Sequence, residues 1–127
     1  MTDDDTLRRI LTSVRVIALV GWSPKPDRPS HGVAAFLAGR GYRVIPVNPK
    51  LKSSLGAVAY PDLGSVPERF EVVDVFRRSD AIPGLADEIL ALPAERRPKV
   101  VWLQTGIRHD EAADRLVAAG IDVVQDR

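Results

Sequence analysis

Residues 16–32 read VIALVGWSPKPDRPSHG, and this stretch decides the fold. Its first five residues, Val16 to Val20, form a continuous apolar run, which is typical of a strand buried on both faces of a parallel sheet. A loop follows from Gly21 to Pro29, because three prolines in nine residues exclude regular structure. Ser30 is a favourable N-cap for the next helix, which Gly41 ends. The stretch therefore predicts a strand–loop–helix unit.

The rest of the chain repeats this alternation of short β-branched apolar runs and helical segments, separated by Gly or Pro. The expected strands are Val16–Val20, Arg43–Val47, a short one at Ala57–Tyr60, Val72–Phe76, Val100–Leu103 and Ile121–Val124. The expected helices are Thr6–Ser13, Ser30–Arg40, Ile82–Leu92 and Asp110–Ala119, with a turn or short helix at Pro61–Val66. This order predicts an α/β, Rossmann-like three-layer sandwich with a mostly parallel sheet of about five or six strands. We expect a single domain over residues 1–127, with a leading helix at 1–14 and the core at 15–127.

Composition limits the classes of function. The 127 residues carry 18 basic and 17 acidic side chains, a formal net charge of +1, which argues against a nucleic-acid or membrane-surface protein. The absence of cysteine excludes disulfides, cysteine-ligated metal and a thiol nucleophile. No apolar run approaches the roughly 20 residues that span a bilayer. We expect a soluble, cytoplasmic protein whose partner is a small molecule, with a protein partner or self-association left open.

Polar side chains follow four of the expected strands. They lie at Gly21–Ser30, Asn48–Lys50, Arg77–Arg78 and Gln104–Gly106. Ligands of open parallel sheets bind beyond the carboxyl ends of the strands, where the strand order reverses. Because the fold would bring all four segments to one edge of the sheet, the sequence predicts a binding site there.

The first of these loops has the chemistry of a phosphate site. Gly21 allows a sharp turn and a close approach to a ligand, while Lys25 and Arg28 offer positive charge. The helix that starts near Ser30 presents unpaired backbone N–H groups to an anion. The alternative is a rigid surface loop with solvated charges. The dinucleotide fingerprint G-x-G-x-x-G is absent and the second strand ends in neutral Asn48, so NAD is disfavoured.

Several motifs together carry a family resemblance. They are GWSPKPDRPSHGV from residue 21, YRVIPVNP from residue 42, VDVFRR from residue 73, WLQTGIR from residue 102 and VQDR from residue 124. In order and spacing they closely resemble the small, single-domain CoA-binding proteins, which are related to the nucleotide-binding part of the succinyl-CoA synthetase α subunit. The resemblance runs from about Val16 to Arg127.

The resemblance implies a Rossmann domain that binds coenzyme A. The resemblance implies contacts to coenzyme A from four segments of the chain. They are the family's pyrophosphate loop, the end of its second strand, its VDVFRR element and its later polar loop. These residues are Gly21, Trp22, Ser23, Lys25, Pro26, Arg28, Ser30, Asn48, Pro49, Lys50, Phe76, Arg77, Arg78, Gln104, Thr105 and Gly106.

Two of these assignments leave alternatives open. Phe76 either lines a slot for the adenine or belongs to the core. Arg77 and Arg78 leave an extended strand in opposite directions, so we expect one of them to reach a phosphate and the other to be a solvated surface charge.

The titratable side chains do not assemble into a catalytic constellation in the sequence. His31 is a first-turn histidine that could contact a phosphate, and His109 lies in a capping neighbourhood. Asp74 interrupts an apolar strand and needs hydrogen-bond partners, which suggests that it braces a neighbouring loop. Asp126 and Arg127 suggest a terminal ion pair. The second domain that carries the phosphohistidine of succinyl-CoA synthetases has no counterpart here.

These observations favour a protein that binds coenzyme A or an acyl-CoA as a non-catalytic carrier, sensor or partner subunit. One alternative is a subunit of an acyl-CoA ligase or transferase that another chain completes. A second is an interaction domain that has lost the cofactor, in which Trp22 would be a contact surface instead of a lid over the ligand.

Overall fold

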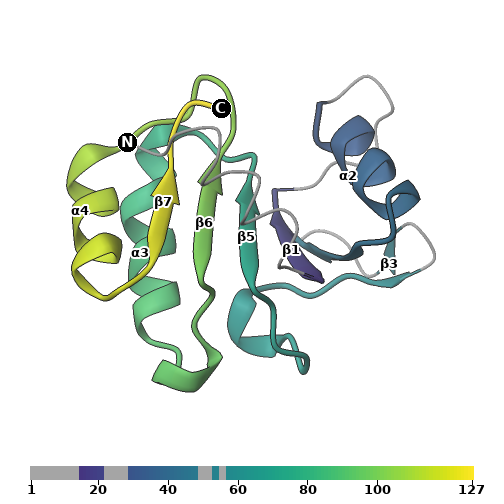
Figure 1. The fold of residues 1–127 in the computed structure, drawn as a ribbon, viewed down its shortest axis with the longest axis horizontal. Coiled ribbons are helices and arrows are strands. Elements are labelled where there is room, and N and C mark those ends of the chain that lie inside the picture. The colour runs from purple at the N-terminus through teal and green to yellow at the C-terminus, as the bar shows by residue number, and fades with distance from the viewer. Residues whose placement is uncertain (1–14, 22–28, 49–52, 55–56) are drawn as a thin grey trace.

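The computed structural model describes residues 15–21, 29–48, 53–54 and 57–127. Within them, five strands form one sheet: β1 (Val16–Val20), β2 (Arg43–Val47), β5 (Val72–Val75), β6 (Val100–Leu103) and β7 (Asp122–Val124) (Figure 1). The spatial order is β2-β1-β5-β6-β7, and every neighbouring pair is parallel. The predicted Rossmann-like fold is confirmed, with each of these strands within one residue of its expected bounds.

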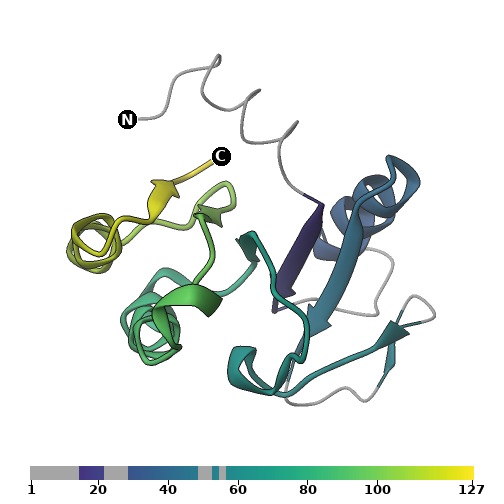
Figure 2. The ribbon, with the colours of Figure 1, turned by 60° about the horizontal axis from the view of Figure 1, so that its bottom comes forward.

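In the described part of the chain, three α-helices pack on the two faces of this sheet. Helix α2 (Pro29–Gly39) lies on one side, and α3 (Ile82–Leu90) and α4 (Asp110–Ala118) lie on the other (Figure 2). The alternation of the strands explains the two layers. In β1, Ala18 and Val20 face α3 and α4, whereas Leu19 faces α2.

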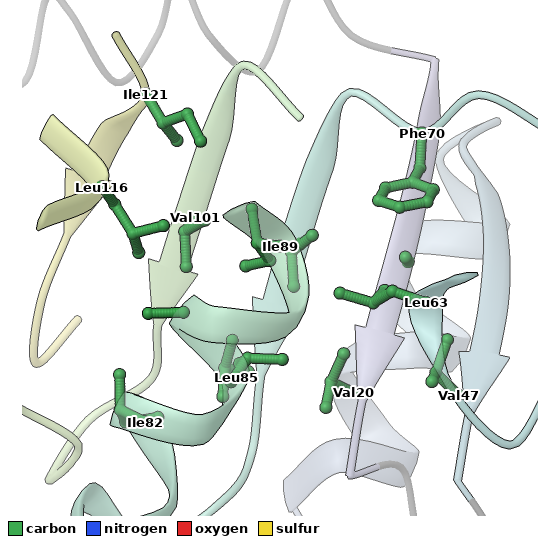
Figure 3. Close-up of a cluster of buried hydrophobic side chains, with 14 of the residues drawn as sticks. Val20, Val47, Leu63, Phe70, Ile82, Leu85, Ile89, Val101, Leu116 and Ile121 are labelled. Atoms are coloured by element: carbon green, nitrogen blue, oxygen red, sulfur yellow. The ribbon is translucent and has the colours of Figure 1, made fainter. Parts of the chain in front are cut away.

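The larger core lies between the sheet and the α3–α4 layer (Figure 3). Ile82, Leu85 and Ile89 occupy one face of α3 and are at most 2% exposed. Leu116 of α4 and Leu63 of the 3-10 helix η1 (Leu63–Ser65) extend the same cluster. Burial on this scale contributes about 1.5–3 kcal/mol per large side chain, so this layer fixes the sheet against which the site is built.

Two helices end in the same way. After α2, the N–H of Gly41 bonds to the carbonyl of Ala38, and the N–H of Tyr42 bonds to that of Leu37. Gly41 has φ +91°, which is the left-handed conformation that this cap requires. Gly120 ends α4 with the same pair of bonds at φ +88°. The predicted stop at Gly41 is confirmed.

Several expected boundaries need correction. Helix α3 ends at Leu90 and not at Leu92, and β7 starts at Asp122 and not at Ile121. Two further corrections concern residues of the predicted site. Helix α2 starts at Pro29, so Ser30 lies in the first turn and not at the N-cap. A proline is favourable at the first helical position, where its missing N–H costs no hydrogen bond. Residues 72–76 do not all belong to the strand, because β5 ends at Val75 and Phe76 begins the following loop.

In a complete Rossmann fold, a third parallel strand would pair with β2, and here only a remnant of it is present among the described residues. The expected strand Ala57–Tyr60 appears as β4 (Ala57–Val58), which pairs antiparallel with β3 (Ser53–Ser54). Tyr60 then forms a single parallel bridge to Val47. Because β2 lies on one side of β1 and β5 on the other, the strand order reverses between β1 and β5, where crevices of such sheets take ligands.

Three short 3-10 helices connect the larger elements: η1, η2 (Ser79–Ala81) and η3 (Ala94–Arg96). Among the described residues, no helix has the length and apolar character needed to cross a membrane. The expected leading helix, Thr6–Ser13, lies outside the described residues.

Candidate functional site at the carboxyl edge of the sheet

Residues that follow four strands lie side by side at the carboxyl edge of the sheet. The N–H of Gly21 donates to the carbonyl of Val47 at 3.1 Å, so the end of β1 is tied to the end of β2. The N–H of Phe76 donates to the carbonyl of Val20 at 2.9 Å. The N–H of Gln104 donates to the carbonyl of Val75 at 3.3 Å. Loops far apart in the chain therefore meet at this edge.

Gly21 is in close contact with the loop that follows β5. A Cβ atom at this position would lie 2.9 Å from the carbonyl oxygen of Phe76 and 3.1 Å from Cγ of Arg77. Gly21 also has φ +84°, a conformation that other residues rarely adopt. Both the backbone and the neighbouring loop therefore require glycine at the point where the strand order reverses.

Phe76 and the two arginines differ in their surroundings. Phe76 is half-buried and packs against a cluster on the α2 side of the sheet that contains Leu19, Ala34 and Val44. Arg77 is half-buried beside Gly21. The side chain of Arg78 is 85% exposed and pairs with Asp80 at 2.5 Å. Arg77 is thus the arginine that lies beside Gly21.

Asn48 follows β2 at the same edge. It is half-buried, and its N–H donates to the carbonyl of Tyr60 at 2.8 Å. The N–H of Tyr60 in turn donates to the carbonyl of Pro46 at 3.0 Å. These two bonds hold the end of β2 in place next to Gly21, which donates to Val47.

A buried acid lies directly beneath this edge. Asp74 of β5 is 5% exposed, and its Oδ1 accepts a hydrogen bond from Nε2 of Gln104 at 2.5 Å. Burial raises the pKa of Asp74 to about 6, and the hydrogen bonds from Gln104 and from the backbone of Val75 oppose that rise. As expected from its place in an apolar strand, Asp74 has a partner and braces the loop that follows β6.

The C-terminal residues hold the same loop from its other side. Oδ1 of Asp126 accepts a hydrogen bond from the N–H of Gly106 at 2.5 Å. The N–H of Asp126 donates to the carbonyl of Ile107, and that of Arg127 to the carbonyl of Leu103. The sequence suggested only a terminal ion pair for Asp126. Its hydrogen bond to Gly106 depends on a sequence separation of 20 residues, for which the sequence carries no local signal.

The remaining polar residues of the loop have different roles. Thr105 and Gly106 are exposed, and Gly106 turns the chain with φ +84°. Nδ1 of His109 accepts a hydrogen bond from the N–H of Ala112 and so caps α4, as its position predicts. Among the described residues, no cluster of His, Asp or Glu is suited to hold a metal ion.

Part of the predicted site lies outside the described residues. These positions are Trp22, Ser23, Lys25, Pro26, Arg28, Pro49 and Lys50. Ser30 and His31 lie in the first turn of α2, and only their backbone is described. The first turn of α2 follows β1 in the chain, and the start of a helix carries unpaired N–H groups and a positive dipole end.

Comparisons with known proteins bear on the family and on the fold. A model of the CoA binding domain family matches residues 15–127. Protein YneT of Bacillus subtilis (strain 168) is 38% identical over 120 residues, which cover 94% of this chain and 86% of that protein. A structure from Pyrococcus horikoshii OT3 has a TM-score of 0.91 at 36% identity and covers 99% of this chain and 86% of its own. A Thermus thermophilus structure has a TM-score of 0.90 at 39% identity, with coverages of 99% and 92%.

Proposed function

The chain belongs to the CoA-binding domain family, and from this premise we propose that it binds coenzyme A, or an acyl-CoA, at the carboxyl edge of its sheet. The observation that carries the proposal is the close contact of Gly21 with Phe76 and Arg77 at the point where the strand order reverses. Because Gly21 has no Cβ atom, the loop that follows β5 can approach the end of β1, which puts Phe76 and Arg77 where ligands of such sheets bind.

The residues at this edge fit the chemistry of the ligand. The diphosphate would lie between Gly21 and the first turn of α2, whose N–H groups favour an anion. Arg77 would engage a phosphate, because a guanidinium can donate two parallel hydrogen bonds to it. The half-buried ring of Phe76 offers an apolar surface to the adenine. Gln104 and Thr105 would supply polar contacts from the loop after β6.

The residues of the first loop and of the end of β2 complete the proposal. Lys25 and Arg28 would add positive charge against the diphosphate, and Lys50 would do so near the adenosine phosphate. Trp22 would lie over the ligand. We propose no reaction for the chain itself, which would act as a carrier, a sensor or a partner subunit.

Calorimetric titration with coenzyme A, ADP and NAD tests the proposal. Coenzyme A should bind most tightly, because it alone adds a 3′-phosphate and a pantetheine arm to the shared ADP moiety. Equal or tighter binding of NAD would contradict the assignment. If coenzyme A binds only when a co-purifying partner is present and the mixture turns over, the ligase-subunit alternative is the correct one.

The two arginines provide a matched pair of variants. Arg77→Ala should weaken the binding of coenzyme A by about 2 kcal/mol, roughly thirtyfold in Kd, because a charge-assisted hydrogen bond is lost. Arg78→Ala should change the Kd by less than about twofold, since an exposed ion pair contributes little. Pantetheine, which has no phosphate, should bind both variants like the unaltered protein. A larger loss from Arg78→Ala would assign the phosphate contact to that residue instead.

A further inference from the structure

An apolar groove runs down the α2 side of the sheet. Its volume is about 210 Å³, and one wall is formed by Val33, Phe36 and Leu37 of α2. Val72 of β5 and Trp102 of β6 contribute to its floor. These strand residues face α2 because they alternate with the residues of the α3–α4 core.

The α2 wall presents apolar surface to water. Phe36 is 63% exposed, and the other large hydrophobic side chain exposed among the described residues, Val117, lies on α4. Burying apolar surface of this kind against a ligand is favourable in proportion to its area. The exposed ring therefore marks the part of the groove that an apolar group would cover.

The groove shares Gln104 with the proposed coenzyme A site. Gln104 belongs to the loop at the carboxyl edge, and it also lines the groove together with Asp74. Asp74 is 5% exposed and holds the Gln104 amide through its hydrogen bond at 2.5 Å. A ligand that starts among the loops at the edge can thus pass Gln104 and enter an apolar space beneath them.

We propose that this groove holds the acyl group of an acyl-CoA, an inference that rests on the proposed function. The pantetheine arm would carry the thioester over the edge past Gln104, and the hydrocarbon would lie against Val33, Phe36 and Trp102. A cavity of about 150 Å³ takes up benzene, with six carbon atoms, so this groove suits an acyl group of about eight carbons.

A chain-length series tests the inference directly. Titrations of the full chain with coenzyme A, acetyl-CoA, hexanoyl-CoA, octanoyl-CoA and palmitoyl-CoA should give affinities that rise up to octanoyl-CoA. The gain should approach fourfold for each buried methylene, the factor that the transfer free energy of that group implies. Palmitoyl-CoA should bind no more tightly than octanoyl-CoA, because the groove has no room for a longer chain.

Two tryptophan substitutions on α2 form a matched pair. Val33→Trp fills the groove and should reduce the preference for octanoyl-CoA over coenzyme A to about one, with the affinity for coenzyme A itself retained. Ala35→Trp places the same side chain on the exposed face of the helix and should leave the full preference intact. A thermal melt of each variant checks that it is folded.

Fluorine NMR of protein labelled with 5-fluorotryptophan gives a second readout without any substitution in the groove. The chain has two tryptophans, and Trp22→Phe serves only to assign their signals. Octanoyl-CoA should shift the Trp102 signal relative to coenzyme A, because Trp102 lines the groove. An unchanged Trp102 signal at saturation would overturn the inference.

The outcomes separate this inference from the function on which it rests. If coenzyme A binds and affinity does not change with acyl length, the groove assignment is wrong and the proposed function stands. If neither coenzyme A nor any acyl-CoA binds, both are wrong. If a chain-length gain appears only after residues 1–14 are removed, the N-terminal segment is the occupant of the groove and the acyl assignment is overturned.

Discussion

Asp74 shows how one buried side chain links stability to pH. Its pKa is raised to about 6 in the folded protein, chiefly by burial, from an ordinary value of 3.8. A raised acid pKa means that the folded state binds the proton more tightly than the unfolded chain does. The stability associated with this group is therefore largest at low pH, and it falls as pH rises from about 4 through about 6.

Asp74→Asn should remove this pH dependence. The amide oxygen of asparagine can still accept the hydrogen bond from Gln104, but the variant carries no charge to bury. The free energy of unfolding of the variant minus that of the unaltered protein should increase by about 2 kcal/mol when the pH is raised from 4.5 to 8. Urea unfolding at the two pH values measures it. If the difference in the free energy of unfolding between the two proteins is the same at both pH values, the pKa of Asp74 is not raised by folding.

At the scale of elements, the C-terminal segment after β7 holds the loop between β6 and α4. Oδ1 of Asp126 accepts a hydrogen bond from the N–H of Gly106, and the N–H of His109 donates to Oε1 of Gln125 at 2.8 Å. The amide of Gln125 also donates to Asp110 at the start of α4. Gln104 is therefore held by Asp74 from the sheet, while the rest of its loop is held by the C-terminal segment. The position of Gln104, one of the proposed ligand contacts, therefore depends on β5 and on the segment after β7.

Asp126→Ala should loosen this loop. Asp126 has φ +57°, which alanine tolerates poorly and asparagine tolerates well. Loss of the hydrogen bond and the backbone cost together predict about 2 kcal/mol of destabilisation by urea unfolding and a weaker affinity for coenzyme A. Asp126→Asn keeps an acceptor and should recover most of both quantities. If neither substitution changes the free energy of unfolding or the affinity, the carboxylate bond to Gly106 does not hold the loop.

At the scale of the whole molecule, ligand binding and folding are linked. If coenzyme A joins loops that follow four strands, it binds the folded chain alone and must raise the Tm. At a free concentration of 100 times Kd the stabilisation is about 2.7 kcal/mol, which corresponds to roughly 10 °C for a chain of this length. NAD at the same concentration should give a much smaller shift.

Ionic strength provides the check on that thermal shift. Phosphate contacts are screened by salt, so raising the salt concentration should reduce the stabilisation by coenzyme A. A shift that does not change with salt would argue that the diphosphate makes no contact with the basic side chains.

Much of the fold is local in origin and could be predicted. Val16–Val20, Arg43–Val47 and Val100–Leu103 were expected with their observed bounds, since each is an apolar run closed by polar or turn residues. Gly41 and Gly120 end their helices through a backbone conformation that glycine adopts at little cost. The short strand near Ala57 was expected, but its antiparallel pairing and the bridge at Tyr60 could not be predicted, because they depend on how the chain returns to β2.

The sequence by itself determined the fold class, the order of the strands along the chain and the chemistry of the loops, because hydrophobic periodicity and Gly and Pro act over a few residues. Only the tertiary structure decided which polar groups meet. It placed Arg77 and not Arg78 beside Gly21, joined Asp74 to Gln104, and brought Asp126 to Gly106. Such contacts depend on sheet register and twist, which set distances between residues far apart in the chain.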